Sequence, residues 1–302
     1  MRRKLLAGVS CAALALAASQ AFSADPAAVS VAPAPPLPYI NAVLSLWAGG
    51  VLLNSEDSEF DGSGLPTFGG DARIGGNQWI LEIYGAYLGK TDDGGDPNSQ
   101  GASYFLGAGH YIMRDPGGDN AYGIFAGLDA AGHMDTEDHS VNAFVGLEGA
   151  VHRGMQTYFG QFGGTFCMTG DCTDTWETGV FGRAGLRHFF NPDTKLEIDA
   201  VVAWGYFDSS DTTTFGYGWG AEFEQQVQGG PFSFFGAYRG TYTEEGSSCT
   251  SCSDDVTDHA FLLGVRVRTG GTDLYTDYKD GASIFNTPVH HFHRFRSFPD
   301  EL

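Results

Sequence analysis

Ionisable side chains recur at every second position in several runs of this chain. Glu222 and Glu224 stand in one such run, and Arg266 and Arg268 stand in another. Period-two spacing puts side chains on one face of a β-strand. Carboxylates facing guanidinium groups form ion pairs and select charged solutes. By this spacing we expect twelve charged side chains on the inner face of a sheet: Glu82, Asp129, Glu148, Arg183, Arg187, Glu197, Asp199, Glu222, Glu224, Arg239, Arg266 and Arg268.

Seven of these twelve residues are acids and five are arginines. One interpretation is a charged passage that selects small solutes. The other is a network of ion pairs that only holds a narrow barrel together, because an unpaired ion in a tight interior is costly. The composition of the set favours neither interpretation decisively, since both require the charges to be paired.

The residues that alternate with these charges are apolar and often aromatic. Phe215, Tyr217 and Trp219 oppose glycines and acids, and Leu263 and Val265 oppose arginines. Such alternation predicts one apolar and one polar face on each strand. We expect about twelve strands, centred on 42–52, 67–74, 79–88, 103–112, 122–133, 141–151, 157–166, 178–189, 196–207, 215–227, 232–242 and 260–268. The predicted fold is all-β, an antiparallel up-and-down transmembrane β-barrel with its apolar face toward lipid.

The breaks between these strands alternate in charge. The acidic set is 54–65, 90–101, 133–140, 167–177, 208–214 and 243–259, and the shorter, less charged set is 75–78, 113–120, 152–156, 190–195 and 228–231. An up-and-down barrel places odd and even connections at opposite ends. Two chemically different ends are typical of an outer-membrane barrel with long outer loops and short periplasmic turns.

The two ends of the chain predict an exported protein. Residues 1–23 have a basic start, a short apolar run and a small-x-small site, and we expect a cleaved signal peptide. Residues 24–39 are rich in Pro and Ala and predict a linker. The barrel should then occupy 40–270, with 271–302 as a periplasmic extension or a final strand. We expect the cell outer membrane as its location.

Cys167, Cys172, Cys249 and Cys252 lie in two of the acidic breaks. An even number of cysteines in an exported protein predicts disulfides, and three pairings of the four are possible. A zinc site of four thiolates is the alternative. The oxidising compartment favours disulfides.

Other candidate sites are weaker. The acidic runs 92–96 and 56–59 offer oxygen ligands for divalent cations, or present a solvated acidic surface that such ions join to lipopolysaccharide. His290, His291 and His293 form a histidine-rich tail. Ser140 follows His139, but no Gly-x-Ser-x-Gly motif is present, so we expect no enzyme and no cofactor. A net charge of −21 argues against nucleic acid as a partner.

The mature chain resembles the outer-membrane β-barrel proteins of alphaproteobacteria, a porin-like group. The resemblance lies in the aromatic–glycine run at 158–164, the run at 280–288, the signal and the linker. It implies a porin-like narrow passage for small solutes with a charged lumen. Two alternatives stay open: a non-conducting barrel whose acidic, disulfide-braced loops form a contact surface, and a secreted soluble β protein.

Overall fold

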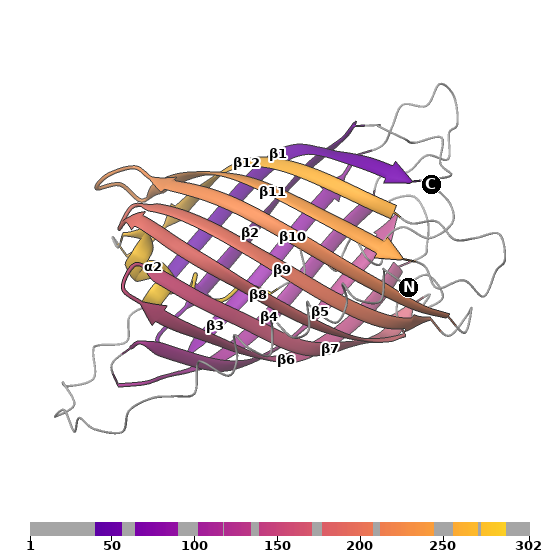
Figure 1. The fold of residues 1–302 in the computed structure, drawn as a ribbon, viewed down its shortest axis with the longest axis horizontal. Coiled ribbons are helices and arrows are strands. Elements are labelled where there is room, and N and C mark those ends of the chain that lie inside the picture. The colour runs from indigo at the N-terminus through magenta and orange to yellow at the C-terminus, as the bar shows by residue number, and fades with distance from the viewer. Residues whose placement is uncertain are drawn as a thin grey trace, which may run out of the picture. The chain divides into compact units, whose positions relative to one another are not determined.

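A computed structural model describes residues 40–55, 64–89, 102–116, 118–133, 139–170, 177–207, 212–244, 256–270 and 273–287. These residues form twelve strands and one helix (Figure 1). The strands are β1 (Asn41–Ser55), β2 (Gly64–Gly75), β3 (Trp79–Leu88), β4 (Ala102–Arg114), β5 (Asn120–His133), β6 (His139–Arg153), β7 (Gln156–Gly170), β8 (Thr178–Asn191), β9 (Thr194–Phe207), β10 (Thr212–Gln226), β11 (Phe232–Glu244) and β12 (Val256–Arg268). The helix is α2 (Leu274–Asp280).

The strands form one closed barrel in which every neighbouring pair is antiparallel. Each strand pairs with the next along the chain, and β1 pairs with β12 from Val43↔Arg268 to Ser55↔Val256. The predicted up-and-down barrel of twelve strands is therefore confirmed. The structure lengthens most strands by one to four residues at an end, because hairpin hydrogen bonds continue past the last clearly alternating residue.

The wall alternates between an apolar outer face and an inner face that carries the charges. Leu263 and Ile83 point outward and are 74% and 64% exposed without surrounding lipid. Glu82, which precedes Ile83, points inward and is buried, and the neighbours of Leu263 are less exposed than Leu263 itself. An apolar outer face and a closed ladder satisfy the two requirements for strands that cross a bilayer. Within the described ranges, no helix has the length and apolar character needed to cross a membrane.

Inward aromatic rings lie over glycines of the neighbouring strand. Phe125 is paired across the ladder with Gly146, and a methyl group built on Gly146 would lie 2.5 Å from Cζ of the ring. Phe144 covers Gly127 in the same way, with a separation of 2.4 Å. A glycine in a strand often marks the close approach of another group. These glycines therefore give the rings room to lie along the wall.

The two ends of the barrel differ in their connections. At one end the chain turns tightly, as at Gly154, whose φ of +56° suits glycine. At that end the β4–β5 turn is closed by a bond from the Gly118 amide to the Asp115 carbonyl, 3.0 Å long. Helix α2 lies at this short-turn end (Figure 1, left), where the Tyr275 amide donates to the Pro192 carbonyl of the β8–β9 turn, 3.0 Å away. The strand ends that flank the predicted acidic connections lie at the other end, and most residues of these connections lie outside the described set.

The segment that follows β12 does not form the predicted final strand or an external extension. Asp273 caps α2 by accepting a hydrogen bond from the Thr276 amide, 2.7 Å away. Helix α2 and residues 281–287 then lie inside the barrel, where Ala282, Ile284 and Phe285 are almost wholly buried. We call residues 273–287 the lumen segment. Its apolar side chains and its carboxylate find partners on the inner wall, which a thirteenth strand or a solvated tail would not provide.

Candidate lumen site

The structure places all twelve predicted charges on the inner face, each less than 10% exposed. It divides them into groups. The largest group joins β8, β9, β10, β11 and β12, and it contains Arg183, Arg187, Glu197, Asp199, Glu222, Glu224, Arg239, Arg266 and Arg268. Glu82 and Glu148 meet at a histidine on β4. Asp129 on β5 accepts a hydrogen bond from Asn142, 3.1 Å away.

Arg266 is the centre of the ion-pair layer. Its guanidinium contacts both oxygens of Glu222, at 2.7 and 3.0 Å, and one oxygen of Glu224, at 2.6 Å. Arg268 holds the other oxygen of Glu224 at 2.6 Å. Bidentate contacts of this kind are the strongest hydrogen bonds available to a guanidinium. Two carboxylates on one strand are therefore kept ionised by two arginines on another.

The layer continues across β8 and β9. Arg183 donates to Asp199 at 2.7 Å, and Arg187 donates to Glu197 at 2.8 Å. Lys195 links this part to the rest, since its ammonium lies 3.1 Å from Glu197 and 2.9 Å from Glu222. Each of these cations has a carboxylate partner on the wall itself. The desolvation of so many charges is offset only because the pairing is complete.

His110 lies between two carboxylates. Its Nδ1 is 3.0 Å from Glu148, and its Nε2 is 3.5 Å from Glu82. Gln161 adds a donor to Glu148 at 3.1 Å. His110 thus stands between two carboxylates on the inner wall.

Several inner-wall residues were absent from the sequence prediction. They are Asp71, Arg73, His110, Lys195 and Asp258, all buried. Lys195 stands two residues before Glu197, and His110 continues the inward series of Leu106 and Ala108. Period-two spacing would have found both if their strands had been extended or their polar members included.

The lumen segment closes the barrel toward the short-turn end. Asp277 on α2 accepts from Arg268 at 3.0 Å and from Asn41. The Tyr278 hydroxyl donates to Glu224 at 2.9 Å and accepts from Lys195 at 2.7 Å. Burial raises the pKa of Tyr278, so the phenol stays neutral and donates. Helix α2 is therefore joined to the centre of the ion-pair layer.

Residues 281–287 cross toward the opposite wall. Ile284 and Phe285 pack with Ile80, Ile112 and Phe159, which belong to β3, β4 and β7. The Asn286 side chain accepts from Arg183 at 3.0 Å. Between the lumen segment and the wall, a cavity of about 40 Å³ remains, lined by Arg73, Glu82, Arg239 and Tyr278 among others. A polar cavity of this size holds one or a few water molecules.

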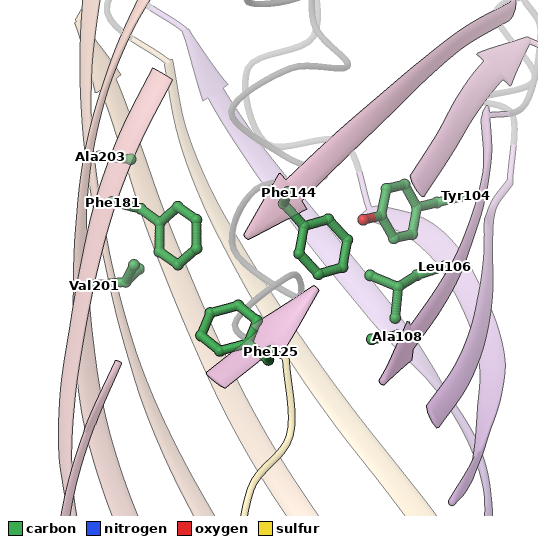
Figure 2. Close-up of a cluster of buried hydrophobic side chains, with 8 residues drawn as sticks. All are labelled: Tyr104, Leu106, Ala108, Phe125, Phe144, Phe181, Val201 and Ala203. Atoms are coloured by element: carbon green, nitrogen blue, oxygen red, sulfur yellow. The ribbon is translucent and has the colours of Figure 1, made fainter. Parts of the chain in front are cut away.

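A second layer of the inner wall is apolar. Tyr104, Leu106, Phe125, Phe144 and Phe181 project inward from β4, β5, β6 and β8 and pack together (Figure 2). The Phe125 ring centre lies 6.2 Å from that of Phe144 and 6.1 Å from that of Phe181. The sequence predicts a polar inner face. The structure shows instead that an apolar layer lies beside the charged one.

The remaining predicted sites lie largely outside the described residues. Cys167 is disulfide-bonded, whereas Cys172, Cys249 and Cys252 lie outside, so the pairing stays a prediction. Residues 1–39, the acidic runs 56–59 and 92–96, and His290, His291 and His293 also lie outside. Ser140 is buried on the inner face, and the side chain of His139 lies outside the described set. Among the described residues, no group of three or more His, Cys, Asp or Glu side chains is arranged to hold a metal ion.

Solved structures that are similar to this chain include outer-membrane channels and a porin, all at low sequence identity. No protein-family model and no curated protein matches the sequence. An outer-membrane channel from Pseudomonas putida F1 is 12% identical with a TM-score of 0.47, and covers 79% of this chain and 99% of its own. The KdgM porin in complex with disordered oligogalacturonate is 8% identical with a TM-score of 0.42, and the match covers 74% and 98%. The outer-membrane channel DcaP of Acinetobacter baumannii is 7% identical with a TM-score of 0.42, and the match covers 76% and 96%. These values are too low to transfer a function, which must come from the chain's own geometry.

Proposed function

We propose that this protein is an integral outer-membrane β-barrel that forms a narrow, porin-like passage for small solutes. The observation that carries the proposal is the division of the barrel wall, with an apolar outer face and a charged inner face on the same closed ladder of twelve strands. Such a wall suits lipid outside and polar solutes inside. A soluble β protein would instead turn its apolar face inward.

The orientation and the partners are part of the same proposal. The acidic, cysteine-bearing connections face outward, and the short turns with the lumen segment face the periplasm. Divalent cations join the acidic loops to lipopolysaccharide phosphates. The aromatic–glycine run at 158–164 and the run at 280–288 support a place among the outer-membrane barrels of alphaproteobacteria.

The lumen segment favours a second candidate function. It packs against the inner wall at the short-turn end, beside a cavity of about 40 Å³, and we take this arrangement as the closed one. A barrel that never releases the segment would be a non-conducting structural or surface-contact protein. The two candidates differ in whether the lumen segment leaves the barrel.

Single-channel recording in planar bilayers separates these candidates. The purified, folded chain should show discrete conductance steps with long closed periods if it is a closable passage. Folded protein that inserts but shows no step at any voltage would leave the structural function. Heat-modifiable migration on a gel shows that the barrel is folded, and solubility without detergent would contradict the membrane placement altogether.

A further inference from the structure

The inner wall binds main-chain atoms of the lumen segment. Nη1 of Arg187 donates to the Ile284 carbonyl at 2.6 Å, and Nε2 of Gln161 donates to the Asn286 carbonyl at 2.9 Å. Glu82 accepts from the Thr287 amide at 2.8 Å. Nη1 of Arg183, which is also on β8, donates to the Asn286 carbonyl at 3.4 Å. Three strands, β8, β7 and β3, thus contribute four bonds to the backbone of residues 284–287. Bonds to main-chain groups supply affinity for a peptide whatever its side chains are.

Arg187, Gln161 and Glu82 also have partners on the barrel wall itself. Arg187 is paired with Glu197 at 2.8 Å, and Gln161 donates to Glu148 at 3.1 Å. Glu82 lies 3.5 Å from His110. After departure of the segment, Arg187 would still have Glu197 as its ion-pair partner and the Gln161 amide would still have an acceptor, so the cost of an unpaired buried charge at Arg187 is avoided.

The barrel itself also closes without the segment. The ladder between β1 and β12 completes the wall, and the segment contributes no strand to it. Four residues, 269–272, separate Arg268 from Asp273. Gly270 has a φ of +103°, in the region that glycine reaches without strain. The lumen segment is thus attached to the end of β12 as a tethered peptide.

We propose that the inner wall around Arg187, Gln161 and Glu82 is a peptide-binding site that residues 284–287 occupy in the intact chain. The ligand class is a short peptide in a non-helical conformation, recognised through its carbonyl and amide groups. The apolar side chains Ile284 and Phe285 add contacts but do not define the class. This inference goes beyond the proposed passage, because a peptide can bind in the lumen whether or not solutes cross it.

The test uses the full chain with a protease site inserted after Gly270, folded first and then cleaved. A labelled synthetic peptide of residues 273–287 is added, and its binding is followed by fluorescence anisotropy after incubation in mild denaturant and its removal. We expect the labelled peptide to bind, and unrelated peptides of equal length and net charge to displace it at concentrations within about tenfold of its own. Binding of the native sequence alone would make the segment a dedicated plug and overturn the proposal. Failure of every peptide to bind would overturn it as well.

Two changes examine the backbone contacts directly. A peptide N-methylated at the Thr287 nitrogen lacks the amide donor to Glu82 but keeps the hydroxyl donor at 2.7 Å, and it should bind about tenfold more weakly. Gln161→Met removes the amide that donates to the Asn286 carbonyl, while nearly keeping the side-chain shape. It should weaken the binding of all peptides to a similar degree. Gln156→Met is the matched control, because Gln156 contacts Tyr158 and not the segment. Equal binding to the Q161M and Q156M barrels would contradict backbone recognition.

The passage and the peptide site fail separately. A cleaved barrel that conducts ions but binds no peptide would refute this inference and leave the passage standing. A barrel that binds peptides and shows no conductance step would refute the passage and leave the peptide site supported.

Discussion

Nε of Arg268 lies 3.0 Å from Oδ2 of Asp277, and this ion pair fastens the lumen segment to the last strand of the barrel. Both side chains are almost wholly buried. Arg268 also holds Glu224 at 2.6 Å, so its charge stays balanced when Asp277 is removed. The other hydrogen-bond partners of Asp277, Asn41 and Ser283, are neutral, so Arg268 provides the positive charge that balances its carboxylate.

Asp277→Ala should loosen the lumen segment without opening the barrel ladder. We expect the fraction of time spent in conducting states to rise about tenfold or more, because a charge-assisted hydrogen bond contributes about 1.5–3 kcal/mol. Single-channel recording measures this fraction. Lys279→Ala is the control, since Lys279 makes only a partly exposed contact of 3.7 Å with Asp119. Closed times equal to those of the parent chain would show that Asp277 does not hold the segment.

Arg266→Met should destabilise the barrel strongly. It leaves Glu222 and Glu224 close together with one cation fewer, and breaking a buried ion pair costs about 3–5 kcal/mol. The denaturant midpoint of the folded form in detergent measures the change. Arg153→Met, at an exposed position near the β6–β7 turn, should shift that midpoint little. A similar midpoint for both variants would mean that water in the lumen already screens the layer.

Gly146→Ala should also destabilise the barrel, through packing rather than charge. The added methyl group would lie 2.5 Å from the Phe125 ring and 2.6 Å from the Phe162 carbonyl. Forcing a group into a packed site costs about 1–3 kcal/mol. Gly107→Ala is the matched control, because a methyl group there meets nothing within 4 Å. The temperature at which gel migration changes compares the two variants, and equal temperatures would count against the steric account.

The open passage should prefer cations modestly. Among the described residues, the inner faces of the strands carry nine acids, Asp71, Glu82, Asp129, Glu148, Glu197, Asp199, Glu222, Glu224 and Asp258, against seven Lys and Arg residues, Arg73, Arg183, Arg187, Lys195, Arg239, Arg266 and Arg268. This excess of two predicts a potassium-to-chloride permeability ratio on the order of a few-fold. Reversal potentials in a salt gradient measure it.

Two neighbouring substitutions test the source of this selectivity. Arg73 lines the cavity, and its ion pair is with Asp71 at 3.0 Å. Arg73→Gln should raise the cation preference, and Asp71→Asn should lower it. Anion selectivity of the parent chain would contradict the assignment of these charges to the solute path.

The four cysteines of the exported chain should resist alkylation until a reductant is added. Cys167 is already disulfide-bonded in the structure. Mass measurement after alkylation without reductant should find no modified thiol among Cys167, Cys172, Cys249 and Cys252. Four modified thiols would refute the disulfides, and peptide mapping would identify the pairs.

Period-two spacing was sufficient to predict the barrel wall. It placed every one of the twelve charges on the inner face, because a one-residue error in register would have turned each of them toward lipid. It missed Lys195 because that residue was assigned to a turn, although β9 begins at Thr194. Strand ends are decided by hairpin hydrogen bonds, which leave little trace in side-chain alternation.

The lumen segment could not be predicted from its own residues. The run from Ala282 to Phe285 is short and has three apolar residues and one serine, and such a run suits a strand, a buried coil or an extension equally well. Its place is decided by partners far away in the chain, such as Arg183 and Glu82. A tertiary preference of this kind appears only when the whole inner wall is assembled.

Each aromatic ring and the glycine that it covers should covary in evolution, although the two residues are separated in the sequence. Phe125 and Gly146 fill one space together, as do Phe144 and Gly127. A larger residue in place of the glycine requires a smaller residue in place of the ring. The exchanged pair, glycine at 125 with phenylalanine at 146, restores the original volume. Relatives of this barrel should therefore differ at such sites two residues at a time, and their covariation would record the register of the strands.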